Sequence, residues 1–409
     1  MANPVGVDSK LSSRPWVVVS IAALTVLVSL GIGRSFGLFL TPVTESLGTG
    51  REVFSLAIAV QSLILGLPLA GMVADRVGAK WVMFWSALLL AVGLFITSQF
   101  ASAPSLFIGI AVVGGAALSG TGFVVALGAV GRAIPEDRRT FVFGLITAAA
   151  SAGILVMALV SQAWIGAFGW QTAMSLLALV VVVVAASALV LPRHEKADLD
   201  PAVAIPMRRA LIQARKSNSY LLLIGGFFVC GFHVAFIGTH LPAFLEDGGL
   251  ASWVAPTALG LIGLFNIGGS FLFGALGDKY RKRTLLAILY FSRALMMVGF
   301  LLIPLTSASA LVFSALMGVV WLGTVPLTSG IVAVLFGTRF LSTLFGFVFL
   351  SHQVGAFLGV WLGGRIFDTT GSYDTVWMIA IVLGVLSALI HLPIKERPEP
   401  VEHPVTASV

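Results

Sequence analysis

Long apolar stretches, separated by short polar turns, run along the whole chain. A helix of about 20 consecutive apolar residues is needed to cross the hydrocarbon core of a bilayer. Twelve stretches reach that length, so the pattern predicts an all-α membrane protein with twelve transmembrane helices. The expected spans are residues 15–43, 52–74, 81–100, 104–131, 140–166, 171–192, 219–244, 252–277, 284–305, 308–335, 340–366 and 372–393.

One polar segment is much longer than the other turns. It is rich in charge, contains Pro201 and Pro206, and separates the sixth expected span from the seventh. Its last part, residues 207–216, carries four basic residues and is expected to form a surface helix. The sequence therefore predicts an N-terminal six-helix half, a cytoplasmic linker, a C-terminal six-helix half and a cytoplasmic tail, at residues 1–192, 193–218, 219–393 and 394–409.

The two halves repeat one another in sequence. Four residues of the first span and its flank recur 200 positions later, where Gly31, Phe36, Pro42 and Gly48 match Gly231, Phe236, Pro242 and Gly248. The turn Gly71-x-x-x-Asp75-Arg76 matches Gly274-x-x-x-Asp278-Lys279 at an offset of 203. An ordered series at a nearly constant offset indicates two parallel pseudo-repeats, an arrangement that supports alternating access to a site between them.

The basic residues predict the orientation in the membrane, because cytoplasmic loops carry an excess of Lys and Arg. With a cytoplasmic N-terminus, all but four of the 24 Lys and Arg residues fall in cytoplasmic segments or at the helix ends beside them. The exceptions are Arg34, Arg51, Arg293 and Arg365. Both termini are therefore expected in the cytoplasm. Six acidic residues then gather on the outer side, namely Glu45, Glu52, Glu246, Asp247, Asp368 and Asp374.

The composition supports a membrane protein and excludes some kinds of partner and site. The chain is 58% hydrophobic and 10% charged, against about 25% charged residues in soluble domains. Its net charge of +7 does not indicate a nucleic-acid partner, because the basic residues follow the predicted topology. The first apolar stretch is too long for a cleavable signal peptide. The single cysteine, Cys230, rules out an intrachain disulfide and a cysteine-based metal site.

Catalysis and ATP-driven pumping find no support in the sequence. No glycine-rich phosphate loop ending in Lys-Ser or Lys-Thr occurs. The cytoplasmic segments are too short to hold a catalytic domain, and the histidines form no paired metal motif. We expect no enzyme activity, no cofactor and no metal. The expected partners are a small-molecule substrate, protons and the lipid bilayer, with the chain acting as a monomer.

The turn from Gly71 to Lys80 resembles a known signature. Gly71-Met72-Val73-Ala74-Asp75-Arg76-Val77-Gly78-Ala79-Lys80 is similar to the loop between helices 2 and 3 of the major facilitator superfamily. Its second copy, from Gly274 to Arg283, departs from the pattern where Arg281 replaces a glycine. The resemblance implies a cytoplasmic gate in which carboxylates cap helix N-termini and pair with arginines. Its expected members are Gly71, Asp75, Arg76, Gly78, Asp278 and Arg138.

A narrower resemblance is to the monocarboxylate transporter family, including its bacterial branch. Arg34-Ser35-Phe36-Gly37-Leu38-Phe39 is similar to the first-helix segment of that family, and Pro135-x-x-Arg138-Arg139 also fits. The resemblance implies that Arg34 takes the place of the basic residue that contacts substrate. The chain departs from better-known members in the span 252–277, where Asn266 and Ser270 stand in place of an Asp and an Arg.

Ionisable residues at membrane depth are costly and are commonly functional. None of the 17 acidic residues falls in the middle of a predicted span, whereas Arg34, Arg293, His233 and His352 do. This distribution favours an anionic substrate over a cationic one. Arg34 either binds a carboxylate with two parallel hydrogen bonds or extends towards the outer surface. Arg293 either reaches the substrate or braces neighbouring helices through their backbone carbonyls, and bracing is favoured.

Polar side chains near these residues complete the expected site. His352 and His233 are candidate proton carriers, since a neutral imidazole accepts a proton near physiological pH, although each is equally well explained as a structural histidine. Gln353, Gln61 and Asn266 are candidate substrate contacts, with helix-packing hydrogen bonds as the alternative. Pro326 is expected to break the span 308–335 near its middle, which frees backbone groups that need partners.

The sequence thus predicts a proton-coupled symporter of a small organic anion, a monocarboxylate, in a bacterial inner membrane. Arg34 would recognise the carboxylate, and a proton would compensate its charge during alternating access. The alternative is a proton-driven exporter of amphipathic or larger compounds. The 29 Phe and 9 Trp residues keep that alternative open, because they suit a wide apolar lining.

Overall fold

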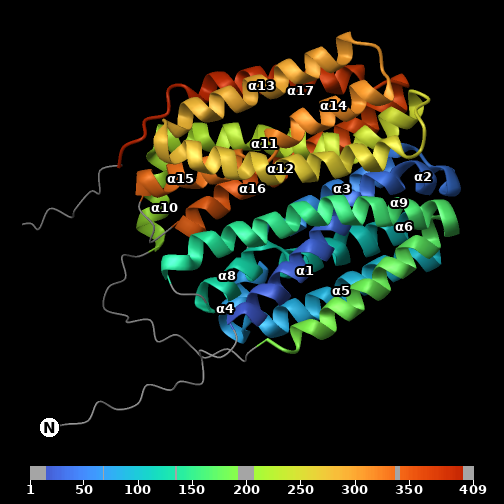
Figure 1. Ribbon diagram of the computed structural model, residues 1–409, viewed down its shortest axis with the longest axis horizontal. Helices are drawn as coiled ribbons and strands as arrows, with labels where there is room; N and C mark the ends of the chain where they lie inside the picture. Colours follow the sequence, from blue (N-terminus) through green and yellow to red (C-terminus); the bar gives the residue numbers. More distant parts are fainter. Residues whose placement is uncertain (1–14, 68, 134–135, 192–206, 337–340, 399–409) are drawn as a thin grey trace, which may run out of the picture.

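Helices of two bundles lie side by side in the computed structural model (Figure 1), which describes residues 15–67, 69–133, 136–191, 207–336 and 341–398. The described chain contains no strand. The N-terminal bundle comprises α1 (Pro15–Ser35), the 3₁₀ helix η1 (Phe36–Phe39), α2 (Leu40–Leu47), α3 (Arg51–Leu65), α4 (Leu69–Val77), α5 (Ala79–Phe100), α6 (Ala103–Leu106), the π-helical segment η2 (Phe107–Gly114), α7 (Gly115–Thr121), α8 (Phe123–Ala133) and α9 (Glu136–Ala188).

Most helices of the C-terminal bundle run through a whole expected span without interruption. They are α11 (Asn218–Asp247), α12 (Val254–Lys279), α13 (Lys282–Leu302), α14 (Ser307–Val319), α15 (Thr324–Phe336), α16 (Leu341–Thr370) and α17 (Asp374–His391). A short helix, α10 (Met207–Lys216), precedes them. It confirms the helix expected at the end of the linker, while residues 192–206 lie outside the described ranges.

Ten described stretches are long and apolar enough to cross a membrane. Two features account for the difference from twelve. The stretch Leu145–Ala188 holds two expected spans, because α9 contains a turn at Gly169, where φ is 77°, and the chain reverses its direction there (Figure 1). The second expected span is divided into α3 and α4 and falls short in length. The observed helices therefore agree with twelve spans.

The predicted break near Pro326 is present. The span 308–335 forms two helices, α14 and α15, and residues 320–323 between them are not helical. Pro326 lies in the first turn of α15, where a missing backbone N–H costs nothing. The helix therefore ends before the proline rather than bending at it, and the freed backbone groups find partners described below.

Close helix packing repeats between the halves in the same way as the sequence does. In the N-terminal half, a Cβ on Gly153 of α9 would collide with the backbone carbonyl of Leu27 on α1. In the C-terminal half, a Cβ on Gly355 of α16 would collide with the carbonyl of Phe228 on α11. Small residues let membrane helices approach to backbone distance. The pairs α1–α9 and α11–α16 are thus equivalent and are held at the same close spacing.

Replacing Gly355 with leucine is expected to destabilise the folded protein by about 2–3 kcal/mol, because the side chain can be accommodated only if α11 and α16 move apart. The melting temperature of the purified protein in detergent, followed by its size-exclusion peak, measures the effect. Gly346 provides the matched control on the same helix, since a Cβ there meets no atom within 4 Å. Equal melting temperatures for Gly355→Leu and Gly346→Leu would contradict this packing account.

Candidate functional site

Arg34 lies at the seam between the two halves. It occupies the last turn of α1, directly before η1, in which Gly37 packs against the backbone carbonyls of Gly238 and Thr239 on α11. The guanidinium is partly buried, and no described residue forms a hydrogen bond or ion pair with it. It lies within electrostatic range of Cys230 on α11. The first helix therefore presents an unpaired cation to the opposite half.

Arg293 is fully buried and holds the break between α14 and α15. Its Nε and Nη2 donate to the carbonyl of Val320 at 3.0 and 2.6 Å, and Nη2 also donates to the carbonyl of Trp321. Its third nitrogen, Nη1, donates to the Cys230 sulfur at 3.6 Å. These carbonyls are the backbone groups that the interrupted helix leaves without partners. The geometry is that of the bracing alternative and leaves no guanidinium nitrogen free for a ligand.

Asn266 satisfies the other side of the same break. Its Oδ1 accepts from the backbone amide of Leu322 at 3.0 Å and from the Ser270 hydroxyl at 3.2 Å. Its Nδ2 donates across the seam to the hydroxyl of Ser151 on α9 at 3.0 Å. The side chain is completely buried. In this conformation Asn266 links the broken helix to the opposite half and does not face an open cavity.

His233 and His352 are buried but differ in their surroundings. His233 on α11 bonds the carbonyl of Ala380 through Nε2 at 2.7 Å, while its Nδ1 has no partner. His352 on α16 lies against the aromatic rings of Phe227 and Phe349, touches the Cys230 thiol, and also has an unpartnered Nδ1. One ring therefore has a fixed backbone bond, and the other joins the cluster around Cys230.

The two glutamines also lie in different places. Gln61 on α3 donates to the carbonyl of Ile110 at 3.0 Å, inside the π-helical segment of its own half. Gln353 on α16 packs against Gly66, which follows α3, so its side chain lies at the seam. The structure thus brings Arg34 and Gln353 to the seam and His352 to the cluster around Cys230, but places Gln61 in a contact between two helices of the N-terminal half.

Replacing Arg293 with methionine is expected to destabilise the protein by about 3 kcal/mol or more, because two buried carbonyls lose their donors. Thermal unfolding in detergent measures the loss. The Arg293→Lys variant restores charge but not the fork of donors, and is expected to recover only part of the stability. Wild-type stability of Arg293→Met would show that the break does not depend on this side chain.

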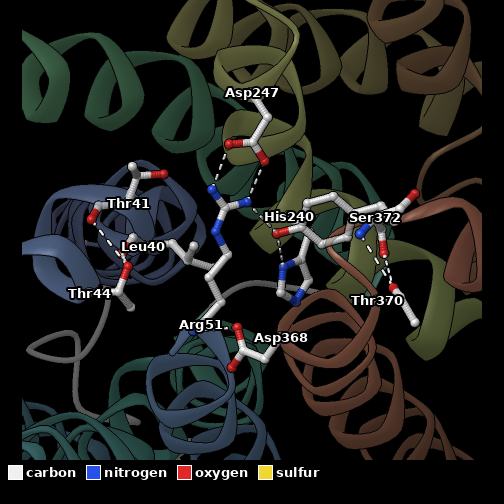
Figure 2. A network of polar contacts seen from close by, with 10 residues as sticks. Leu40, Thr41, Thr44, Arg51, His240, Asp247, Asp368, Thr370 and Ser372 are labelled. Carbon is white, nitrogen blue, oxygen red and sulfur yellow. Dashed lines mark hydrogen bonds and ion pairs between the residues drawn. The ribbon is translucent and has the colours of Figure 1, made fainter. Parts of the chain in front are cut away.

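At one end of the molecule, ion pairs join the halves in what we term the inter-half clamp: Arg51 and Glu52 of α3 with Asp247, Trp361, Arg365, Asp368 and Tyr373. The guanidinium of Arg51 binds both carboxylate oxygens of Asp247, at 2.6 and 2.7 Å (Figure 2). It also lies 4.0 Å from the centre of the Phe367 ring. Bidentate pairing of this kind fixes position as well as charge.

A carboxylate of the C-terminal half caps a helix of the N-terminal half. The backbone amides of Arg51 and Glu52, at the start of α3, donate to the two oxygens of Asp368 at 2.9 and 2.7 Å. A negative charge at this position also favours the helix dipole. Glu52 in turn accepts from Trp361 at 3.1 Å and from Arg365 at 2.9 Å.

Tyr373 connects the clamp to a buried histidine. Burial raises the pKa of the Tyr373 hydroxyl to about 12, so the group keeps its proton. It accepts from Arg51 Nη1 at 3.0 Å and lies 3.1 Å from Nδ1 of His240. Because His240 Nε2 lies 2.8 Å from the carbonyl of Val360, the ring carries its proton there and Nδ1 accepts from the tyrosine.

Two features of the sequence agree with this clamp, although neither identifies its pairs. Arg51 was an exception to the basic-residue rule, and Glu52, Asp247 and Asp368 belonged to the acidic group on the same predicted side. Arginines among acids on one predicted membrane face, Arg51 and Arg365, are the signal that could have located the clamp. Which carboxylate Arg51 meets depends on neighbours 196 positions away in the chain.

Only part of the expected cytoplasmic gate lies among the described side chains. Gly71 lies against Val124 of α8, and Gly78 adopts a φ of 93° before α5, a conformation that favours glycine. The side chains of Asp75, Arg76, Arg138 and Asp278 lie outside the described residues. Among the described side chains, no three His, Cys, Asp or Glu residues gather as metal ligands.

Comparison with known proteins places the chain among transporters. The family model of the Major Facilitator Superfamily matches residues 20–360. An uncharacterized MFS-type transporter of Bacillus subtilis, YcxA, is 26% identical over 396 residues, which cover 92% of this chain and 94% of that protein. Monocarboxylate transporter 13 of Rattus norvegicus is 26% identical, covering 92% and 89%, and monocarboxylate transporter 11 of Homo sapiens is 26% identical, covering 92% and 82%. Both resemblances seen in the sequence are confirmed.

Proposed function

Because the chain belongs to the Major Facilitator Superfamily, and is a transporter rather than an enzyme, we propose that it moves a small organic anion with protons across a bacterial inner membrane. The anion is a monocarboxylate, and transport proceeds by alternating access in a single chain. Both termini lie in the cytoplasm. Several relatives, covered over most of their length, are named monocarboxylate transporters, which supports this substrate class.

The observation that carries the proposal is the unpaired guanidinium of Arg34 at the seam. A partly buried arginine without a counter-ion is an attractive site for a carboxylate, which it binds with two parallel charge-assisted hydrogen bonds. No described acidic side chain contacts it. A cationic substrate would be repelled at this position, so the arrangement favours anions. Gln353 also lies at the seam, and because no described residue hydrogen-bonds its amide, that group is available for a second polar contact.

The inter-half clamp supports alternating access. Under the proposed topology, α3 begins at the outer face, so the clamp closes the outer side and Arg34 is reached from the cytoplasm. Rocking of the halves then requires Arg51 to separate from Asp247, and Asp368 to separate from the backbone amides at the start of α3. Charged contacts that are partly exposed suit this role, because water replaces them at modest cost when they open.

Proton coupling is better supported at His352 than at His233. Both rings have an unpartnered Nδ1, but only His352 belongs to the cluster around Cys230. His233 has one nitrogen committed to a backbone carbonyl and lies within electrostatic range of Arg293. A second positive charge beside that guanidinium would be unfavourable.

Uptake by proteoliposomes of the full chain at about pH 6 and about pH 8 tests the proposal, with a panel of short monocarboxylates, their uncharged amides, dicarboxylates and an amphipathic cation. We expect a monocarboxylate to enter, faster at the lower pH, and its amide to be excluded. Transport of the cation without any anion would contradict the proposed substrate class. Uptake of the anion that does not change with pH would remove the proton from the mechanism.

A further inference from the structure

Arg293 carries a buried positive charge that no carboxylate compensates. The side chain is completely buried, and an arginine remains ionised in proteins. Its contacts are the carbonyls of Val320 and Trp321, the face of the Tyr290 ring at 5.3 Å, and the Cys230 sulfur. No Asp or Glu of the described chain touches it. A buried charge is strongly unfavourable unless an opposite charge lies beside it, and Cys230 is the acid that contacts the guanidinium directly.

Cys230 lies in a built polar cluster rather than in an apolar wall. Its sulfur is 3.2 Å from the hydroxyl of Thr324, at the start of α15, and 3.6 Å from Arg293 Nη1. His352 of α16 also contacts it. The hydroxyl of Tyr290 on α13 is fully buried, approaches the same sulfur, and has no hydrogen-bond partner of ordinary geometry. One guanidinium donor and several other polar groups thus converge on the sulfur from three helices, surroundings that can stabilise a thiolate.

The remaining titratable groups around the sulfur are all basic or aromatic. Arg34 faces it from α1, and His233 lies one helical turn away on α11 itself. His391 of α17 stacks on Tyr290 at 5.0 Å. No described carboxylate faces the sulfur from any of these helices. The cluster is therefore positive unless Cys230 loses its proton.

We propose that Cys230 is the proton-binding acid of the transport cycle, alternating between a thiolate paired with Arg293 and a neutral thiol. The proposal rests on the proposed proton-coupled anion transport and deepens it. In a chain without a carboxylate at mid-membrane, the thiol takes the place that an acid would hold. His352, in contact with the sulfur and with a free ring nitrogen, is the group to which the proton is passed.

The position of Cys230 explains how a proton and an anion would be coupled. A thiolate within electrostatic range of Arg34 lowers the positive potential that attracts the substrate carboxylate. Protonation of the sulfur removes that negative charge, so the anion binds more tightly at Arg34. By linkage, a bound anion raises the affinity of Cys230 for its proton to the same extent. One proton and one monocarboxylate then cross together with no net charge.

Infrared spectroscopy of the full chain in liposomes tests the ionisation directly, because the S–H stretch is free of other protein bands and Cys230 is the single cysteine. The Cys230→Ser variant supplies the baseline and keeps a hydroxyl for Thr324 and Arg293. We expect no S–H band in the wild type at about pH 8 without substrate, and a band after acidification or addition of the transported anion. A full S–H band at about pH 8 without substrate would overturn the proposal.

Transport measured with the same two proteins tests the coupling. For the wild type, the apparent affinity for the anion is expected to rise as the pH falls, by up to about tenfold per pH unit if one proton is fully linked to binding. In Cys230→Ser the affinity is expected to change less than about twofold over the same range. An equal pH dependence in both proteins would overturn the role of Cys230. If the wild type transports no anion, the proposed function itself fails, a result distinct from one confined to the variant.

Discussion

Replacing Arg34 with alanine is expected to lower kcat/KM for anion uptake by roughly 10- to 150-fold, the equivalent of about 1.5–3 kcal/mol for hydrogen bonds to a charged group. The reason is the isolation of this guanidinium. No described residue pairs with it, so its removal takes away a substrate contact without breaking a structural one. The folded protein should therefore keep its stability while it loses transport.

Initial uptake rates in proteoliposomes, at substrate concentrations well below KM, measure this loss. Arg34→Lys keeps the charge but loses the planar fork, and is expected to fall between the wild type and alanine. Arg281, exposed in the turn between α12 and α13, provides a matched control, and Arg281→Ala should transport normally. Uptake by Arg34→Ala at the wild-type rate would exclude Arg34 as the carboxylate-binding residue.

The second large effect is expected at the inter-half clamp, where Arg51→Glu would replace attraction by repulsion. The new carboxylate would face Asp247, while Asp368 caps the backbone amide of the same residue. The side chain of Arg51 is 12% exposed and that of Asp247 is 38% exposed, so solvent weakens the pair. We expect a shift of about 1–2 kcal/mol away from the closed arrangement, roughly a 5- to 30-fold change in population.

Distances between spin labels on the two halves measure that population. Ser46 on α2 and Thr375 on α17 are exposed near the clamp and accept labels, while Cys230 is buried. Arg51→Glu should broaden the distribution towards longer distances and slow uptake. Combining it with Asp247→Arg should restore both, since the pair is re-formed with reversed polarity. Failure of the exchange to restore either would indicate that Asp368 dominates the clamp.

Arg365 offers a control within the same network. Its side chain is 56% exposed and donates to Glu52 at 2.9 Å. An ion pair as exposed as this contributes little, so Arg365→Ala should leave the label distances nearly unchanged. A shift as large as that of Arg51→Glu would mean that the clamp acts through Glu52 rather than through the Arg51–Asp247 pair.

Much of the architecture follows from local properties of the chain. Span length and apolar composition predicted the membrane helices, because each must satisfy its own backbone hydrogen bonds in lipid. These segments are therefore predicted to form helices rather than strands without any knowledge of long-range contacts. Pro326 predicted the interruption before α15 for the same local reason. The internal repeat also indicated which positions are equivalent in the two halves. Equivalent glycines such as Gly31 and Gly231 both lie where helices pack closely.

The sequence also identified single candidate residues, but it did not identify the partners of those residues. Arg34 was marked by charge at membrane depth, and the structure adds that it is unpaired at the seam. Arg293 and Asn266 were marked by the same rule. Only the tertiary structure shows that both satisfy one broken helix, through backbone groups of Val320 and Leu322. A sequence states the cost of a buried polar group, but not which neighbour offsets it.

By itself, then, the sequence determined twelve membrane helices in two repeated halves and an interior without a carboxylate in the middle of any expected span. The tertiary structure decided which polar groups meet: Arg51 with Asp247, 196 positions apart, and Arg293 with Cys230, 63 positions apart. The physical reason is one of range. Helix formation in a bilayer depends on successive residues, whereas ion pairs act over a few ångströms between helices whose adjacency is set by packing of the whole bundle.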